Sequence, residues 1–258
     1  MRGETCIPDI RIARGTGLTD KNSQNAAIFA PETDDVFARI AGRYDRLCDI
    51  FSLGIHRLWK AHMARRAAAE DGAVVLDVAS GTGDIPQRLL RRGSRATTIW
   101  VTDLCPQMLD MARAKLGDPR VRFALRDAEN LAEVADGSID LFTMSFGMKI
   151  CDRARVMAEA WRVLKPGGRL LCLEAARIPV PWVHAAYLKY MDWCLPLIGR
   201  LAAEGDRSAY DYLLRGVHGF PEQQALVREL EAVGFVEVRY TNLTFGIVAL
   251  HEAVKRAL

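Results

Sequence analysis

The stretch VVLDVASGTGD, from Val74 to Asp84, decides the fold of this chain. An apolar, β-branched run ends in an acidic residue, and a loop of small residues then opens a helix. This order is typical of the first parallel strand of an α/β sheet, with a nucleotide-type pocket at its carboxyl end. The stretch contains neither the G-K-[ST] of a P-loop nor the G-x-G-x-x-G of a dinucleotide site. Gly81 and Gly83 would let a ligand approach the backbone closely.

Carboxylates around this loop indicate which ligand it takes. Asp77 and Asp84 flank the loop, where they would oppose a pyrophosphate but suit the ammonium and sulfonium charges of S-adenosylmethionine. Asp103 follows the second expected strand, about twenty residues further on, where it can accept hydrogen bonds from ribose hydroxyls or cap the next helix. Asp127 and Ala128 end the third strand and can read an adenine edge or close a simple turn. Together these residues favour S-adenosylmethionine over NAD or ATP.

Strand-like and helix-like stretches alternate along most of the chain. The expected strands are 74–78, 98–102, 121–125, 139–145, 168–173, 236–240 and 244–250, and the expected helices are a stretch from residue 36, then 54–69, 85–92, 107–116, 153–164 and 221–233. This alternation predicts a doubly wound, mostly parallel seven-stranded sheet preceded by helices. The last two strands are expected to form an antiparallel pair. Gly234 is expected to cap the last helix, and residues 166–168 are expected to form a turn.

Two segments fall outside this alternation. Residues 1–35 are polar and aperiodic, which predicts a flexible arm or short cap, or a disordered leader without function, ahead of one domain over 36–258. Residues 178–217 are helical in pattern and rich in aromatic side chains. We interpret them as an insertion over the carboxyl edge of the sheet, either a lid for an apolar substrate or ordinary helix packing.

Composition narrows the class of protein. With 258 residues, half of them apolar, the chain can bury one substantial core. The net charge of +3 comes from interspersed charges, which argues against a nucleic-acid partner and leaves weak attraction to an anionic membrane open. The six cysteines form no C-x-x-C pair, so no metal site is expected and reduced thiols in the cytoplasm are favoured. We find no signal peptide and no run of membrane-spanning length.

Further motifs follow one another in an order that matches a known family. They are FARIAGRYDRLCDIFSLGIHRLWK (37–60), LDVASGTGD, TDLCPQML, RDAENL, MSFGM, WRVLKPGGRLLCLE, SAYDYL, GFPEQ and YTNLTFGIVALH. On these motifs the chain resembles the ubiquinone/menaquinone biosynthesis C-methyltransferases, Rossmann-like class I S-adenosylmethionine enzymes, over about residues 36–255. The expected donor site comprises Asp77, Ser80, Gly81, Thr82, Gly83, Asp103, Leu104, Asp127, Ala128 and Ser145, of which the resemblance implies direct contact for Thr82, Asp103, Asp127, Ala128 and Ser145.

Departures from the family pattern lie on the acceptor side. The family's F-G-x-R-N appears here as F-G-M-K-I, so its Arg is Lys149 and its Asn is Ile150. The family Asn after the Y-D pair is Cys48, and its E-F-S is Glu174 followed by two alanines. Arg presents a planar fork whereas Lys is a point charge, and Ile lacks the donor and acceptor of Asn. The donor half is therefore expected to be intact and the acceptor half rebuilt.

The expected function is C-methylation of a quinol-like aromatic ring. Lys149 is the first candidate for stabilising a phenolate, with a solvated lysine as the ordinary alternative, and Tyr44 and His218 are candidates for moving protons. His218 could equally be a solvated or capping histidine. An O- or N-methyltransferase of another small aromatic metabolite is a second hypothesis, and a non-catalytic protein that binds S-adenosylmethionine is a third. The acceptor is expected to be aromatic, with or without a lipid tail; a homodimer and peripheral membrane association are left open.

Overall fold

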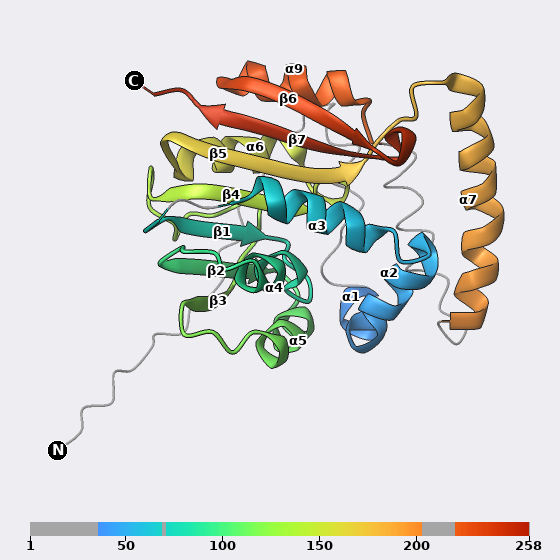
Figure 1. The fold of residues 1–258 in the computed structure, drawn as a ribbon, viewed down its shortest axis with the longest axis horizontal. Coiled ribbons are helices and arrows are strands. Elements are labelled where there is room, and N and C mark those ends of the chain that lie inside the picture. Colours follow the sequence, from blue (N-terminus) through green and yellow to red (C-terminus); the bar gives the residue numbers. More distant parts are fainter. Residues whose placement is uncertain (1–35, 69–70, 203–219, 258) are drawn as a thin grey trace, which may run out of the picture.

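A seven-stranded sheet forms the centre of the molecule (Figure 1). The computed structural model describes residues 36–68, 71–202 and 220–257, so the predicted arm over 1–35 lies outside it. The strands are β1 (Val74–Val78), β2 (Thr98–Asp103), β3 (Val121–Leu125), β4 (Ile139–Ser145), β5 (Leu164–Ala175), β6 (Phe235–Leu243) and β7 (Val248–Lys255). The helices are α1 (Val36–Ile40), α2 (Tyr44–Ser52), α3 (His56–Arg66), α4 (Asp84–Arg91), α5 (Pro106–Lys115), α6 (Arg153–Val163), α7 (Pro181–Ala202) and α9 (Gln223–Val233).

The strand order is β3-β2-β1-β4-β5-β7-β6. Strands β1 to β5 pair in parallel, and β7 is antiparallel to both of its neighbours. The predicted doubly wound, mostly parallel sheet is therefore confirmed, including its antiparallel last pair. The chain builds outward from β1 to β3 and then returns to β4, so the direction of winding reverses between β1 and β4. Open α/β sheets bind ligands beyond the carboxyl ends of the strands at such a reversal.

Helices cover both faces of the sheet, because the strands bury apolar residues on each side. One core joins α3, α4 and α5 to the sheet through side chains such as Met63, Leu89, Leu109, Val75 and Leu171. The other joins α6 and α9 to the opposite face through Val156, Met157, Leu226, Phe142 and Leu170. Burial on both faces explains why the strands are nearly continuous apolar runs in the sequence.

The ends of β2 and β6 differ from the prediction by one to three residues, and β5 and β7 differ more, next to glycine or proline. β1, β3 and β4 have the predicted bounds. The prediction that β5 begins at residue 168, after a turn, is wrong. It begins at Leu164, because residues 166–168 form an irregularity within the strand: Ile139 pairs with Leu164 and Leu141 already pairs with Arg169.

A second correction concerns the last hairpin. A strand was predicted from residue 244, but Thr244–Gly246 form a short 3₁₀ helix, η4, and β7 starts at Val248. Thr244 and Phe245 have consecutive φ angles of 47° and 57°, which lie outside the extended region of a regular strand. The predicted cap of the preceding helix is confirmed, since α9 ends at Gly234 with φ 115°.

Three helices stand at the carboxyl ends of the parallel strands: α1, α2 and α7 (Figure 1). α7 is 22 residues long and packs against α2. It supplies the first part of the predicted insertion, whose residues from 203 onward lie outside the described ranges. Among the described residues, no helix has both the length and the apolar character needed to cross a bilayer.

Candidate active site

A cavity of about 230 Å³ lies where β1, β2, β3 and β4 end, and we call it the polar cavity because Asp103, Asp127 and Ser145 are on its wall. Its wall is made by Phe37, Tyr44, Ala79, Gly81, Asp103, Leu104, Cys105, Met108, Arg126, Asp127, Ala128, Glu129, Ser145, Phe146, Gly147, Ile150 and Cys151. Six of the predicted donor-site residues are among them, namely Gly81, Asp103, Leu104, Asp127, Ala128 and Ser145. The topology thus brings together residues that lie far apart in the sequence.

Asp103 holds the glycine loop in place. Its Oδ2 accepts a hydrogen bond of 2.7 Å from the backbone N–H of Gly81, and its Oδ1 accepts one of 2.9 Å from the N–H of Cys105. Gly81 has a φ of 56°, the left-handed region that glycine adopts without strain. The carboxylate therefore fixes both the loop after β1 and the start of α5 while lying on the cavity wall.

Asp77 and Ser80 lie beneath the loop and do not line the polar cavity. Asp77 is 1% exposed; its Oδ1 accepts a hydrogen bond of 2.5 Å from the Thr143 hydroxyl, and its other oxygen accepts one from the Ser80 hydroxyl. Burial raises the pKa of Asp77 to about 7, although both hydroxyls act in the opposite direction. We expected Asp77 to contact the ligand. In the structure its carboxylate instead accepts hydrogen bonds from Ser80 and Thr143 and supports the loop after β1.

Thr82, Gly83 and Asp84 also face away from the polar cavity. The Thr82 hydroxyl donates to Asp45 on α2, Gly83 packs against α5, and Asp84 forms an ion pair of 2.8 Å with Lys60 on α3. These three residues of the loop therefore contact the surrounding helices α2, α5 and α3. The expectation that Asp84 faces a sulfonium does not fit this placement.

Ser145 gives an observation that bears directly on a ligand. Its hydroxyl oxygen is buried and has no hydrogen-bond partner within the part of the chain that the structure describes. Buried polar atoms are almost always paired, so the Ser145 hydroxyl is suited to form a hydrogen bond with a ligand in the cavity. Together with the Asp103 and Asp127 carboxylates and a buried Ala128, the wall suits a ligand with hydroxyls, an amine and an adenine ring.

An apolar cavity of about 370 Å³ adjoins the polar one. Its wall is made by Ile40, Tyr44, Leu47, Cys48, Phe51, Ser52, Leu53, Ile55, His56, Trp59, Lys60, Phe146, Lys149, Ala175, Tyr187, Tyr190, Met191, Thr244, Ile247 and Val248. Tyr44 and Phe146 belong to both walls. Of the departures from the family pattern, Cys48, Lys149 and Ala175 line the apolar cavity, whereas Ile150 lines the polar one.

Lys149 is buried and paired, not solvated. Its Nζ lies 3.0 Å from Glu174 Oε1 and donates a hydrogen bond of 2.5 Å to the Phe146 carbonyl, and the two charged side chains are 5% and 0% exposed. Glu174 also accepts the backbone N–H groups of Lys149 and Ala175. Phe146 has a φ of 59°, rare for an aromatic residue. The ion pair thus holds a strained residue on the shared wall.

Tyr44 connects the two cavities from the first turn of α2. The neighbouring Cys48 and burial raise the pKa of the Tyr44 hydroxyl well above its usual value, and burial raises that of the Cys48 thiol. Both groups are therefore protonated at neutral pH. The third catalytic candidate, His218, lies outside the described residues.

His56 is the wall residue that the sequence analysis missed. It lies four residues after Ser52, across the break between α2 and α3, and four before Lys60, one turn further along α3. That spacing was the available signal. Cys48, Cys105, Cys151 and Cys172 are not in disulfide bonds, and no cluster of three or more His, Cys, Asp or Glu side chains in the described ranges could hold a metal ion.

Solved structures share this fold. The chain is similar to an S-adenosylmethionine-dependent methyltransferase from Thermotoga maritima (TM-score 0.62, 19% identity, covering 86% of this chain and 98% of that one). It is also similar to phosphoethanolamine N-methyltransferase 2 from Haemonchus contortus, solved with S-adenosylmethionine (TM-score 0.56, 16% identity, covering 76% and 52%). The sheet order and the likeness to these structures show a Rossmann-like α/β fold of the kind found in these methyltransferases.

Sequence comparison identifies the family. The model of the ubiE/COQ5 methyltransferase family matches residues 22–255. The ubiquinone/menaquinone biosynthesis C-methyltransferase UbiE of Dinoroseobacter shibae is 40% identical over 225 residues, covering 85% of this chain and 89% of that protein. The mitochondrial 2-methoxy-6-polyprenyl-1,4-benzoquinol methylase of Schizosaccharomyces pombe is 38% identical over 240 residues, covering 86% and 78%. The chain belongs to the ubiE/COQ5 methyltransferase family and is a methyltransferase that uses S-adenosylmethionine.

Proposed function

We propose that this enzyme methylates a ring carbon of a quinol-like aromatic acceptor. The observation that carries the proposal is the pair of adjoining cavities, one polar and one apolar, which share Tyr44 and Phe146. A donor in one cavity and an acceptor in the other would lie next to each other at these two shared residues. Such positioning of two reactants is a major source of rate enhancement. The names of the relatives, which refer to quinone biosynthesis and a benzoquinol, support the choice of acceptor.

The polar cavity is proposed to hold the methyl donor. Asp103 suits the ribose hydroxyls, Asp127 and Ala128 suit the adenine edge, and the Ser145 hydroxyl offers an unused hydrogen bond. When bound, S-adenosylmethionine supplies an electrophilic methyl group. An Asp103→Asn variant should weaken donor binding by about 1.5–3 kcal/mol, the usual size of a hydrogen bond to a charged group. Calorimetry measures this directly, and an unchanged affinity would contradict the assignment.

The apolar cavity is proposed to hold the acceptor ring and the start of a lipid tail. Its wall combines aliphatic and aromatic side chains, which exclude water from the reacting carbon. Large apolar side chains are exposed nearby, including Leu53 beside the cavity, Trp182 and Trp193 on α7, and Phe245 next to Thr244. This surface supports peripheral contact of a cytoplasmic enzyme with a membrane that holds the acceptor.

Two wall residues are proposed to act on the ring oxygen. A hydroxylated ring becomes nucleophilic at carbon as its oxygen gains negative charge, and the Lys149 ammonium on the wall would stabilise that charge. Glu174 holds the ammonium in place. Because Tyr44 stays protonated, its hydroxyl can donate a hydrogen bond at the junction of the cavities. Neither residue needs to change its protonation state.

Incubation with a methyl-labelled donor and a demethylated quinol tests the proposal. We expect label on a ring carbon of the product, located by NMR. Label on a hydroxyl or amine instead would favour the second hypothesis, an O- or N-methyltransferase acting on another aromatic compound. Donor binding without transfer to any quinol would contradict the proposal. Asp103→Asn serves as the donor-site control, because it should reduce transfer without changing which atom is methylated.

A further inference from the structure

His56 brings an imidazole to the wall of the apolar cavity. It is the first residue of α3, it is 7% exposed, and it lies beside Trp59 and Lys60 on the same wall. His56 belongs neither to the Lys149–Glu174 ion pair nor to the two large apolar cores, and the proposed function gives it no role. A buried titratable group on a cavity wall is a candidate for chemistry when its protonation state suits a task.

The hydrogen bonds around His56 favour a proton on Nδ1. The Ser52 hydroxyl has one hydrogen, and it donates this to the Cys48 carbonyl at 2.7 Å. With the hydrogen on that side, Ser52 Oγ is positioned to accept from His56 Nδ1, 2.8 Å away, in the tautomer that carries its proton on Nδ1. Asp49 Oδ1, at 3.8 Å from Nδ1, favours a hydrogen on the same nitrogen. Nε2 is then left with its lone pair, and the described residues offer it no hydrogen-bond partner.

Burial and the charges around the imidazole keep His56 neutral at neutral pH. Burial and the Lys60 ammonium on α3 lower the pKa of His56, and Arg57 acts in the same direction. Asp84 on α4 and Asp49 on α2 act against this, but each is engaged with a cation, Lys60 and Arg57 respectively. A neutral imidazole with a free Nε2 lone pair is a proton acceptor.

We propose that His56 Nε2 is the base that removes the proton from the acceptor's ring hydroxyl. The proposal rests on the proposed function and names the residue that activates its substrate. As Nε2 takes the hydroxyl proton, the ring carbon forms a bond to the methyl carbon while the methyl–sulfur bond breaks and leaves its electron pair on sulfur. Loss of the hydrogen from the methylated ring carbon restores aromaticity, and the imidazolium returns its proton to the ring oxygen. One proton is released to solvent overall.

The other titratable groups on this wall are less suited to the task. The Tyr44 hydroxyl and Cys48 thiol have raised pKa values and hold their protons. Lys60 and Lys149 are paired with Asp84 and Glu174 and carry positive charge. The arrangement therefore separates two tasks, with Lys149 as the fixed cation and His56 as the proton acceptor.

Nitrogen NMR tests the base without catalysis. In the full chain labelled at histidine, we expect His56 to be the tautomer protonated at Nδ1. An alkylphenol should move the His56 Nε2 resonance, whereas the methyl ether of the same alkylphenol should not, because it has no proton to donate. His62, one and a half turns further along α3 and bound to Arg65, should respond to neither compound. A proton on Nε2, or the same response to both compounds, would overturn the proposal.

Kinetics supplies the second test, with His62→Gln as the matched control. His56→Gln should lower kcat by about 100-fold or more, the usual contribution of a general base, with unchanged donor affinity. Because the pKa of His56 is lowered, the native enzyme should lose activity only at pH values below the ordinary histidine value of about 6.5, and this acid limb should disappear in the His56 variant. An unchanged rate and pH profile in His56→Gln would refute the base. A native enzyme that methylates no quinol would instead refute the proposed function, while the NMR experiment still decides the role of His56.

Discussion

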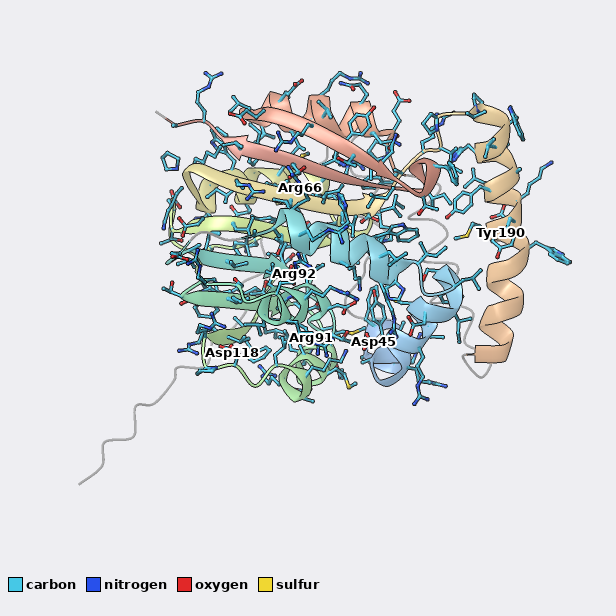
Figure 2. All side chains as sticks on the ribbon, in the orientation of Figure 1. Asp45, Arg66, Arg91, Arg92, Asp118 and Tyr190 are labelled. Carbon is cyan, nitrogen blue, oxygen red and sulfur yellow. The ribbon has the colours of Figure 1, made fainter. Side chains whose placement is uncertain are left out.

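Thr82 Oγ1 donates a hydrogen bond of 2.6 Å to Asp45 Oδ1 and thereby ties the loop after β1 to α2. Asp45, which is labelled in Figure 2, also pairs with Lys115 on α5. The loop carries Gly81 of the polar cavity, and α2 carries Tyr44 and Cys48 of the apolar cavity. A single carboxylate therefore links the element that faces the donor to the element that faces the acceptor.

Thr82→Val removes this link while keeping the volume of the buried side chain. We expect a loss of about 1 kcal/mol in the free energy of unfolding, because the hydrogen bond ends on a half-exposed carboxylate. We also expect weaker donor binding, since the loop is less well held. Urea denaturation and calorimetry measure the two effects. Thr97→Val is the control, because its hydroxyl bonds to the backbone at the other end of the strand. Equal donor affinities in both variants would argue against the link.

Gly83→Ala and Gly93→Ala form a matched pair. Both glycines have similar φ angles, 77° and 74°, so alanine is strained at each. A Cβ at Gly83 would lie 2.8 Å from Leu116 Cδ1 and 3.1 Å from Ala112 Cβ, whereas one at Gly93 meets nothing within 4 Å. We expect Gly83→Ala to cost about 1–3 kcal/mol more, the range for overpacking. Chemical denaturation of both variants checks this, and equal stabilities would contradict the close packing of the loop on α5.

The Lys149–Glu174 pair should behave as a buried ion pair. Lys149→Met leaves the carboxylate of Glu174 unpaired in the interior, which should reduce stability by about 3–5 kcal/mol. The double variant Lys149→Met with Glu174→Gln should recover much of that loss, because no buried charge remains. Arg95→Met, in the exposed pair with Asp71, should cost less than about 1 kcal/mol. A Lys149→Met variant as stable as Arg95→Met would show that the pair is solvated.

Asp77 should make the folded state less stable as the pH rises. Its pKa is about 7 in the folded chain and 3.8 as the reference value, so between these values the folded state holds a proton that the unfolded state has lost. Stability from this group is complete below pH 4 and is lost as the pH rises through 7, by about 4 kcal/mol in total. Asp77→Asn should remove this slope. Unfolding midpoints between pH 4 and 8 test it, and parallel curves for both proteins would refute it.

The sequence predicted the sheet well because strand positions depend on local patterns. Val74–Val78 is apolar except for Asp77 and stands directly before a glycine loop, a pattern that indicates a buried strand. Irregular backbone was harder to predict. Residues 166–168 look like a turn but form an irregularity inside β5, and the left-handed conformation of Thr244 and Phe245 depends on the packing of η4.

The site was only partly predictable, because a motif identifies residues but not the direction of their side chains. Asp103 and Asp77 both end strands next to the same loop, yet one lies on the cavity wall and the other lies beneath the loop. Thr82 belongs to the same motif, yet its side chain faces α2 and not the cavity. The environment of Lys149 could not be predicted either, because its partner Glu174 lies 25 residues away, on β5.

The position of β7 sets an order of assembly. β7 follows β6 along the chain but lies between β5 and β6, so β6 cannot join the sheet before β7 has paired with β5. The two strands must therefore dock as a preformed hairpin or in reverse chain order. Thr244, Ile247 and Val248, at the turn of this hairpin, are part of the apolar cavity wall. An intermediate with β1 to β5 already folded would hold most of the polar cavity and lack a closed chamber for the acceptor.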